Sequence, residues 1–319
     1  MRSNDLFERI TRQIADAIAA GAGAFEMPWH RWSEGLAEPV NAITGRPYRG
    51  VNTILLWAAA EHAGYSSGRW ATYRQWSEAG AQVRKGEKST AILFWKPAHA
   101  GDLGHEDDDQ GGPDDRHHRS FIAKVYCVFN ADQVDGAPQA PLPTPLSDDE
   151  RIAAAESFFA NVGATVHHLG DRAFYRPSTD EIHMPRFEQF RDAAAYYSTL
   201  GHEHVHWTGA NHRLDRDLKN RFGSEAYAFE ELIAELGAAF LAARLGLSVE
   251  RRPDHAAYIA GWLKVLGQDP RAILTASSKA HQALDYLESL QPAEGDGVIP
   301  QAVDHAAAKA PRVSDVAHA

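Results

Sequence analysis

A proline-rich stretch divides this chain of 319 residues into two unlike parts, since four prolines fall within residues 137–146. Such spacing keeps the backbone extended and semi-rigid. A helix start follows at once, because Ser147 and Glu150 have the spacing of a capping box. A chain of this length usually folds into more than one domain, each with its own hydrophobic core. We therefore predict a first domain at residues 1–136, a linker at residues 137–146 and a second domain at residues 147–291.

Tryptophan and charge are distributed unevenly along the first domain. Six of the eight tryptophans precede residue 98, and residues 1–98 carry a small excess of Lys and Arg although the whole chain has a net charge of −11. Apolar strands are expected at residues 90–95 and 121–129, and they can pair as a hairpin. Between them, residues 100–119 are acidic and rich in turn formers, which predicts a disordered insertion.

The second domain begins with a helix that is expected to end near Asn161, before Gly163. Three short strands should follow, at residues 165–169, 173–175 and 181–184. The last of them is a candidate edge strand that aligns an extended peptide, although a plain structural strand fits equally well. From Phe190 the pattern is helical, and residues 292–319 resemble a disordered tail. The predicted fold class is α+β, with a mostly helical second domain.

Composition indicates the cellular compartment in which such a protein is found. Cys127 is the only cysteine, so neither a disulfide scaffold nor a cysteine-based zinc ribbon can form. No apolar run is long enough to span a membrane, and residues 1–10 lack the apolar core of a signal peptide. We expect a cytoplasmic protein with no membrane partner.

Residues 202–206 contain the pattern His-Glu-x-x-His. On a helix this spacing places His202 and His206 on one face, so that both imidazoles can bind one Zn²⁺. Glu203 can take a proton from a water whose pKa the metal has lowered to roughly 7. The pentapeptide alone is weak evidence, and two histidines on an ordinary polar helix face are the alternative. His204 points elsewhere on the helix and is not expected to be a ligand.

A second helix, expected at residues 225–245, supplies the missing carboxylate. Glu230, Glu231 and Glu235 interrupt an otherwise apolar segment there. We predict Glu231 as the third ligand and Glu235 as the residue that accepts the outer N–H of a ligand histidine, and the reverse assignment stays open. Three protein ligands leave a fourth position for water, as in catalytic zinc sites.

Three more residues are candidates for donating a hydrogen bond to a developing oxyanion, namely Tyr227, His255 and Tyr258. An ordinary packed role is the preferred interpretation of each.

In the first domain, aromatic residues alternate with cations. Unpaired bases stack on aromatic side chains while Lys and Arg neutralise phosphates, so this composition favours single-stranded DNA. Most tryptophans are nevertheless core residues, and composition alone does not decide between the two roles. The candidate DNA-binding residues are Trp29, Trp32, Arg46, Tyr48, Arg49, Trp70, Tyr73, Trp76, Arg84, Lys85, Lys88 and Lys96.

Several longer motifs resemble one family. Residues 28–29, 39–52, 70–76 and 83–89 are similar to the single-stranded-DNA-binding domain of ArdC-type antirestriction proteins, which adds Asn52 to the DNA-binding candidates. The second part resembles the zincin-like metallopeptidase domain of the same family. The residues that carry this second resemblance are 202–209, 213–216, 221–227, 230–240 and 258–263.

The resemblance implies a protein of plasmids or phages, related also to the N-terminal region of conjugative primases, that protects incoming DNA from host restriction. It implies that His202, His206 and a glutamate of the 231–235 segment hold one Zn²⁺ or another divalent metal per chain, and that Glu203 is catalytic. The acidic insertion and His204 depart from the family pattern. The insertion could shield the DNA groove, and His204 could perturb metal loading.

Two functions follow as hypotheses. In the first, the chain binds single-stranded DNA non-specifically and carries a zinc peptidase that acts on an unidentified protein substrate, for example a host restriction component. In the second, it only coats DNA and its metal site is structural and catalytically silent. A metal-dependent nuclease fits less well, because nucleases mostly use carboxylate-rich two-metal sites.

Overall fold

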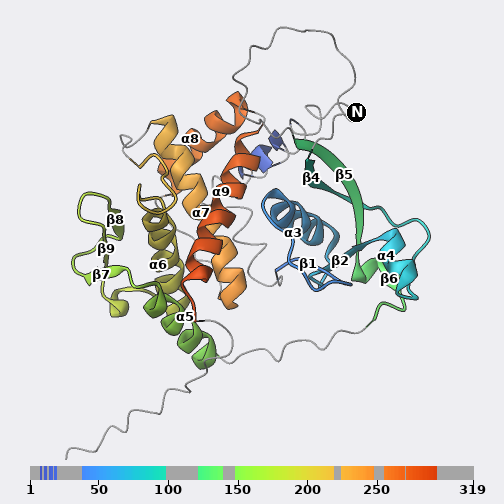
Figure 1. Ribbon diagram of the computed structural model, residues 1–319, viewed down its shortest axis with the longest axis horizontal. Coiled ribbons are helices and arrows are strands. Elements are labelled where there is room, and N and C mark those ends of the chain that lie inside the picture. The colour runs from blue at the N-terminus through green and yellow to red at the C-terminus, as the bar shows by residue number, and fades with distance from the viewer. Residues whose placement is uncertain are drawn as a thin grey trace, which may run out of the picture.

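The fold is known here from a computed structural model (Figure 1). The described residues are 8, 11–12, 14–16, 18–19, 38–97, 121–138, 148–218, 224–247, 255–269 and 271–292. The predicted acidic insertion, most of the linker and almost all of the predicted tail lie outside these residues.

The first half is built on a four-stranded sheet. Its strand order is β1 (Val40–Asn41), β2 (Arg69–Thr72), β5 (Phe121–Asn130) and β4 (Thr90–Pro97). β1 is parallel to β2, and the other pairs are antiparallel. The pairing of β4 with β5 confirms the predicted hairpin.

One long helix and one short helix accompany this sheet. α3 (Val51–Ala63) packs on one face of it, and α4 (Tyr73–Glu78) begins at Thr72, whose side chain accepts a hydrogen bond from the Gln75 amide. A small ladder of β3 (Gln82–Val83) and β6 (Val134–Asp135) follows, with the 3₁₀ turn η2 (Ala131–Gln133) before β6.

The second half starts as predicted, with α5 (Asp148–Val162) and then β7 (Thr165–His168), β8 (Phe174–Arg176) and β9 (Glu181–Met184). The strand order is β7-β9-β8. β9 therefore pairs on both sides, and the hypothesis that residues 181–184 form an edge strand for peptide binding is wrong. Strand order depends on long-range pairing, which local alternation of side chains does not encode.

The remaining elements are helical. After the turn η3 (Phe187–Gln189) come α6 (Ala193–Thr208), α7 (Glu225–Leu245), α8 (His255–Gln268) and α9 (Ala272–Ser289). α7 lies at the centre and contacts each of the other three. Within the described parts of the chain, no helix combines the length and hydropathy that a membrane span requires. The fold class is α+β, as predicted.

The two halves share one hydrophobic core. α3 lies between the sheet of the first half and helices α7 and α9 of the second (Figure 1), and Ile54 and Trp57 of α3 belong to the same buried cluster as Leu236 and Phe240 of α7. The rings of Trp57 and Phe240 are 5.9 Å apart. Burial of this shared apolar surface holds the halves together.

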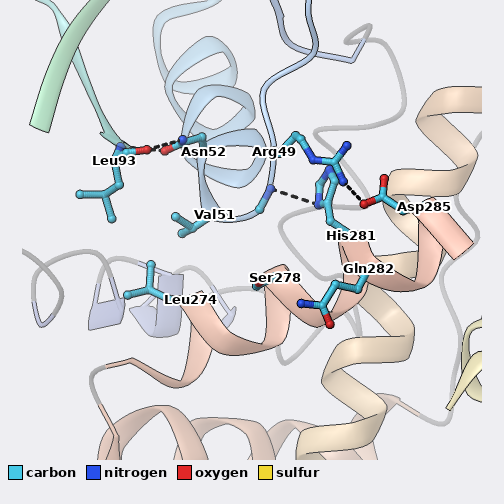
Figure 2. Close-up of a pocket in the computed structure, with 10 residues that line it drawn as sticks. Arg49, Val51, Asn52, Leu93, Leu274, Ser278, His281, Gln282 and Asp285 are labelled. Carbon is cyan, nitrogen blue, oxygen red and sulfur yellow. Dashed lines mark hydrogen bonds and ion pairs between the residues drawn. The ribbon is translucent and has the colours of Figure 1, made fainter. Parts of the chain in front are cut away.

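Polar contacts reinforce the boundary between α3 and α9. The Gly50 amide donates a hydrogen bond to Nδ1 of His281 (3.1 Å), and Arg49 forms an ion pair with Asp285 (Figure 2). These residues line a pocket of about 250 Å³ between the two halves.

Candidate metal centre

α6 carries the histidines of the His-Glu-x-x-His pattern on its buried face. The helix begins at Asp192, whose side chain accepts a hydrogen bond from the Ala195 amide (2.8 Å). His202 is buried and His206 is largely buried. Their rings lie one turn apart with centroids separated by 4.8 Å. The helix therefore presents both imidazoles to the same space, as the spacing predicts.

α7 lies close enough to α6 to bring a carboxylate to these rings. The two helices approach at Gly237, where an added Cβ atom would come within 2.7 Å of the Val205 side chain. Any larger residue at position 237 would force the helices apart or displace Val205. This close approach places Glu231 opposite His202 and His206.

The three side chains form one compact donor set. Nε2 of His202 and Nε2 of His206 are 3.1 Å apart, and the Glu231 carboxylate oxygens lie 3.4 Å from the first and 3.5 Å from the second. Ligand atoms at about 2.0–2.1 Å from a tetrahedral zinc ion are about 3.4 Å from one another. Among the described residues, His202, His206 and Glu231 are the one group of this kind.

Each histidine also has a carboxylate behind it. Nδ1 of His202 lies 3.1 Å from the Glu235 carboxylate, and Nδ1 of His206 donates a hydrogen bond to Glu230 (3.2 Å). Protons held on the Nδ1 atoms leave both Nε2 lone pairs pointing into the centre of the donor set. Two lone pairs and a carboxylate that converge in a buried space require a cation, so this donor set fits a divalent metal.

Arg216 fixes the second of these carboxylates. Its guanidinium donates to both oxygens of Glu230 (2.9 and 3.0 Å), to Oγ1 of Thr208 (2.9 Å) and to the Val205 carbonyl (2.5 Å). Arg216, Glu230 and Thr208 are all buried. A charged pair that is hydrogen-bonded on every side holds its partners in one geometry.

The pKa values of His206 and Glu231 also indicate a site that attracts positive charge. Burial alone would lower the pKa of His206, but the Glu231 and Glu230 carboxylates outweigh burial and raise that pKa to about 10. Burial opposes ionisation of Glu231, yet His206 and His202 hold its pKa well below the usual range. The carboxylates thus attract positive charge strongly, and a metal ion would satisfy them in place of protons.

Comparisons with known proteins agree with this geometry. A family model described as the N-terminal domain of anti-restriction factor ArdC matches residues 4–129, and one described as zincin-like metallopeptidase matches residues 153–279. A metal-free crystal structure of the antirestriction protein ArdC from the R388 plasmid is 38% identical, with a TM-score of 0.72 over 90% of this chain and 97% of that chain. This chain belongs to the ArdC antirestriction family.

Other relatives extend the family. The Mn(II)-bound structure of the same ArdC protein matches with a TM-score of 0.70 over 89% of this chain. A protein of Sinorhizobium fredii known as y4eC is 50% identical over 90% of this chain and 92% of its own length. A DNA primase TraC of Escherichia coli is 40% identical over 88% of this chain, which spans only 27% of the primase.

His204 is a core residue rather than a further ligand. Its Nδ1 donates a hydrogen bond to the Leu200 carbonyl (2.8 Å), and its ring packs on Phe159 at 4.7 Å. Burial lowers the pKa of His204 to about 4, so the ring is neutral. His204 therefore packs within the core and lies outside the donor set.

The remaining predicted residues of this half have different surroundings. Glu203 follows His202 on α6 and is buried. Tyr227 is half-buried, one helical turn before Glu231 on α7. The side chains of His255 and Tyr258, in the first turns of α8, lie outside the described residues.

Several predicted DNA-binding residues in the ArdC-type first half are structural. Trp70 and Trp76 are only 1% and 0% exposed, so neither can stack on a base, and their assignment to the DNA surface is wrong. The reason is that α3 covers Trp70, while Trp76 packs in a second small core with Val83. Asn52 hydrogen-bonds both the amide and the carbonyl of Leu93 (2.8 and 2.7 Å), which pairs the free edge of β4.

Other DNA-binding candidates remain accessible. Arg46, Tyr73, Lys85 and Lys88 are exposed and Tyr48 is half-buried. Arg49 is paired with Asp285, and Arg84 is engaged by Glu87 and the Asp132 carbonyl. Trp29, Trp32 and the Lys96 side chain lie outside the described residues.

Sequence reasoning missed two groups of residues. The roles of Glu230 and Arg216 depend on a contact between α7 and the loop after α6, and their spacing along the chain gives no sign of it. Phe94 and Tyr126 are exposed aromatic residues that are absent from the sequence-based candidates, although alternation along the predicted hairpin places both on one face.

Proposed function

We propose that this chain is an antirestriction protein that binds single-stranded DNA with its first half and holds a catalytic divalent metal, Zn²⁺ being the expected ion, in its second. The observation that carries the catalytic part is the convergence of His202, His206 and Glu231 at 3.1–3.5 Å, with Glu235 and Glu230 behind the histidines. Membership of the ArdC family supports the biological role.

Three protein donors leave room for water and a substrate carbonyl. A divalent ion held there would lower the pKa of a bound water and polarise the carbonyl oxygen. Glu203 would accept the proton of the attacking water and pass it to the leaving amine. Its place on α6 suits this role, since it projects about 60° around the helix from His206.

The site chemistry is tested by Glu203→Gln, which removes the base and keeps the side-chain shape. We expect metal content, measured by elemental analysis, to equal that of the unaltered chain. The variant should no longer protect an unmodified plasmid that enters a restricting host. Glu203→Gln that still protects would favour the alternative, a DNA-coating protein with a silent metal site.

The metal itself is tested with Glu231→Gln. This variant should bind metal much more weakly, and Glu225→Gln, an exposed position on the same helix, is its matched control. A protein substrate would be sought by incubating the metal-loaded chain with purified restriction subunits. Cleavage by the unaltered chain but not by Glu203→Gln would identify one.

DNA binding is tested by fluorescence anisotropy of labelled oligonucleotides with the full chain. We expect preference for single strands over duplex and a steep loss of affinity with salt, because cations on the first half neutralise phosphates. Equal binding of both forms would contradict the proposal. Intact oligonucleotides after incubation with metal would exclude the nuclease hypothesis.

A further inference from the structure

The sheet of the first half has one face that α3 covers only in part. At its inner end, Ile92 and Val128 pack under Leu56 and Ala60 of α3. Beyond the end of this contact the same face opens into a groove of about 420 Å³, which we call the β4–β5 groove. Ligand pockets commonly have volumes of this size.

Two aromatic side chains form the outer floor of this groove. In the β4–β5 ladder Ile92 is opposite Tyr126 and Phe94 is opposite Lys124, so these four side chains share one face. Phe94 is 59% exposed and Tyr126 is 43% exposed, and their rings meet edge to face at 6.0 Å.

Two adjacent exposed aromatic rings form an apolar patch, and such patches commonly mark binding sites. Folding leaves roughly half of their surface in water, although the same sheet face is well packed one residue pair further in. No other described side chain stacks on either ring. This contrasts with Trp70, which lies on the same face and is fully covered.

Polar groups line the wall of the groove. Asn41 and Gln75 meet there through a hydrogen bond of 3.3 Å, and Arg74 and Glu78 form an exposed ion pair at 2.7 Å. A flat ligand with apolar faces and hydrogen-bonding edges matches such a groove. Lys124, exposed beside Phe94, adds a positive charge at its rim.

We propose that the β4–β5 groove binds an unpaired nucleobase of single-stranded DNA, which stacks on Phe94 and Tyr126 while Lys124 contacts the adjoining phosphate. This inference rests on the proposed DNA binding and assigns it to residues outside the sequence-based candidates. Duplex DNA keeps its bases stacked on one another, so the groove discriminates against it.

The test is anisotropy titration of a labelled oligo(dT) with the full chain and single variants. Phe94→Ala and Tyr126→Ala should each weaken binding about 5- to 150-fold, which is the usual cost of losing one stacked base. Tyr126→Phe should bind as the unaltered chain does. Val125→Ala is the control, since Val125 is 50% exposed on the same strand and alternation places its side chain on the opposite face of the sheet from Tyr126.

A second probe separates base stacking from charge. An abasic oligonucleotide of the same length keeps the phosphates and should bind the unaltered chain about as weakly as oligo(dT) binds Phe94→Ala. Photocrosslinking of an iododeoxyuridine oligonucleotide should label the peptide that contains Phe94 or Tyr126. Thermal melting of each variant excludes loss of fold.

The outcomes distinguish the two claims. If the unaltered chain does not bind single strands, the proposed DNA binding itself fails. If it binds, but Phe94→Ala and Tyr126→Ala bind as tightly as Val125→Ala and the abasic strand binds equally well, DNA binding stands and the groove is overturned. Binding of apolar peptides in place of oligonucleotides would likewise overturn it.

Discussion

The Gly50 amide donates a hydrogen bond to Nδ1 of His281 across 3.1 Å, so the turn that begins α3 is bound to α9 of the other half. The ring of His281 also lies 4.2 Å from that of Phe240 on α7, the helix that carries Glu231. His281 therefore links the half proposed to bind DNA to the helix that carries the candidate ligand Glu231, beside the direct contact of Trp57 with Phe240.

The first prediction concerns the pH dependence of this contact. Burial, with help from Arg49, lowers the pKa of His281 from 6.5 to about 4. The unfolded residue takes up a proton near pH 6.5 and the folded one only near pH 4, so the stabilisation is complete above pH 6.5 and is lost as the pH falls toward 4.

Between pH 7 and pH 5 this single group should lower the free energy of unfolding by about 2 kcal/mol. His281→Phe keeps a ring against Phe240 and removes the titrating group. The free energy of unfolding of this variant should therefore fall by about 2 kcal/mol less than that of the unaltered chain between pH 7 and pH 5. Urea unfolding in the presence of a chelator measures both. Identical slopes for the two chains would show that His281 does not titrate as described.

The second prediction concerns the shared core. Trp57→Ala should lower the free energy of unfolding by about 3–5 kcal/mol, because a large buried ring is lost between α3 and α7. Since the core is continuous, hydrogen exchange should rise in both halves together. Leu169→Ala, at an exposed position, is the control. Faster exchange confined to one half would mean that the halves unfold separately.

The third prediction concerns the approach of α6 and α7. Gly237→Ala should destabilise the chain by about 1–2 kcal/mol and weaken metal binding, because the new methyl group overlaps Val205. Adding Val205→Ala makes room, so Gly237→Ala should cost less in that background. A double-mutant cycle of unfolding and metal titration measures the coupling. Additive effects would show that this contact does not set the distance between the helices.

The fourth prediction concerns the carboxylate behind His206. Glu230→Gln should weaken metal affinity about 10- to 100-fold, since the hydrogen bond that orients the ring loses its charge. The amide oxygen can still accept from Arg216, which limits the damage to the fold. Competition with a chromophoric chelator gives the affinity, with Glu225→Gln for comparison. Equal metal affinities of these two variants would show that Glu230 does not support metal binding.

Local sequence patterns predict the individual elements and the candidate metal ligands on α6 and α7. Helical spacing places His202 and His206 on one face, and Ser224 begins α7 through a hydrogen bond that its side chain accepts from the Tyr227 amide (3.2 Å). The hairpin of β4 and β5 and the three strands of the second half were also predictable. The individual helices and strands are local features, so residues a few positions apart encode them.

How these elements meet depends on long-range packing. Three glutamates lie within two turns of α7, and which of them faces which histidine depends on how closely α6 approaches at Gly237. Likewise Trp70 is buried while Phe94 is exposed because α3 covers only part of one sheet face. Such contacts join segments far apart in the chain, and the pattern of side chains along one segment does not specify what will cover it.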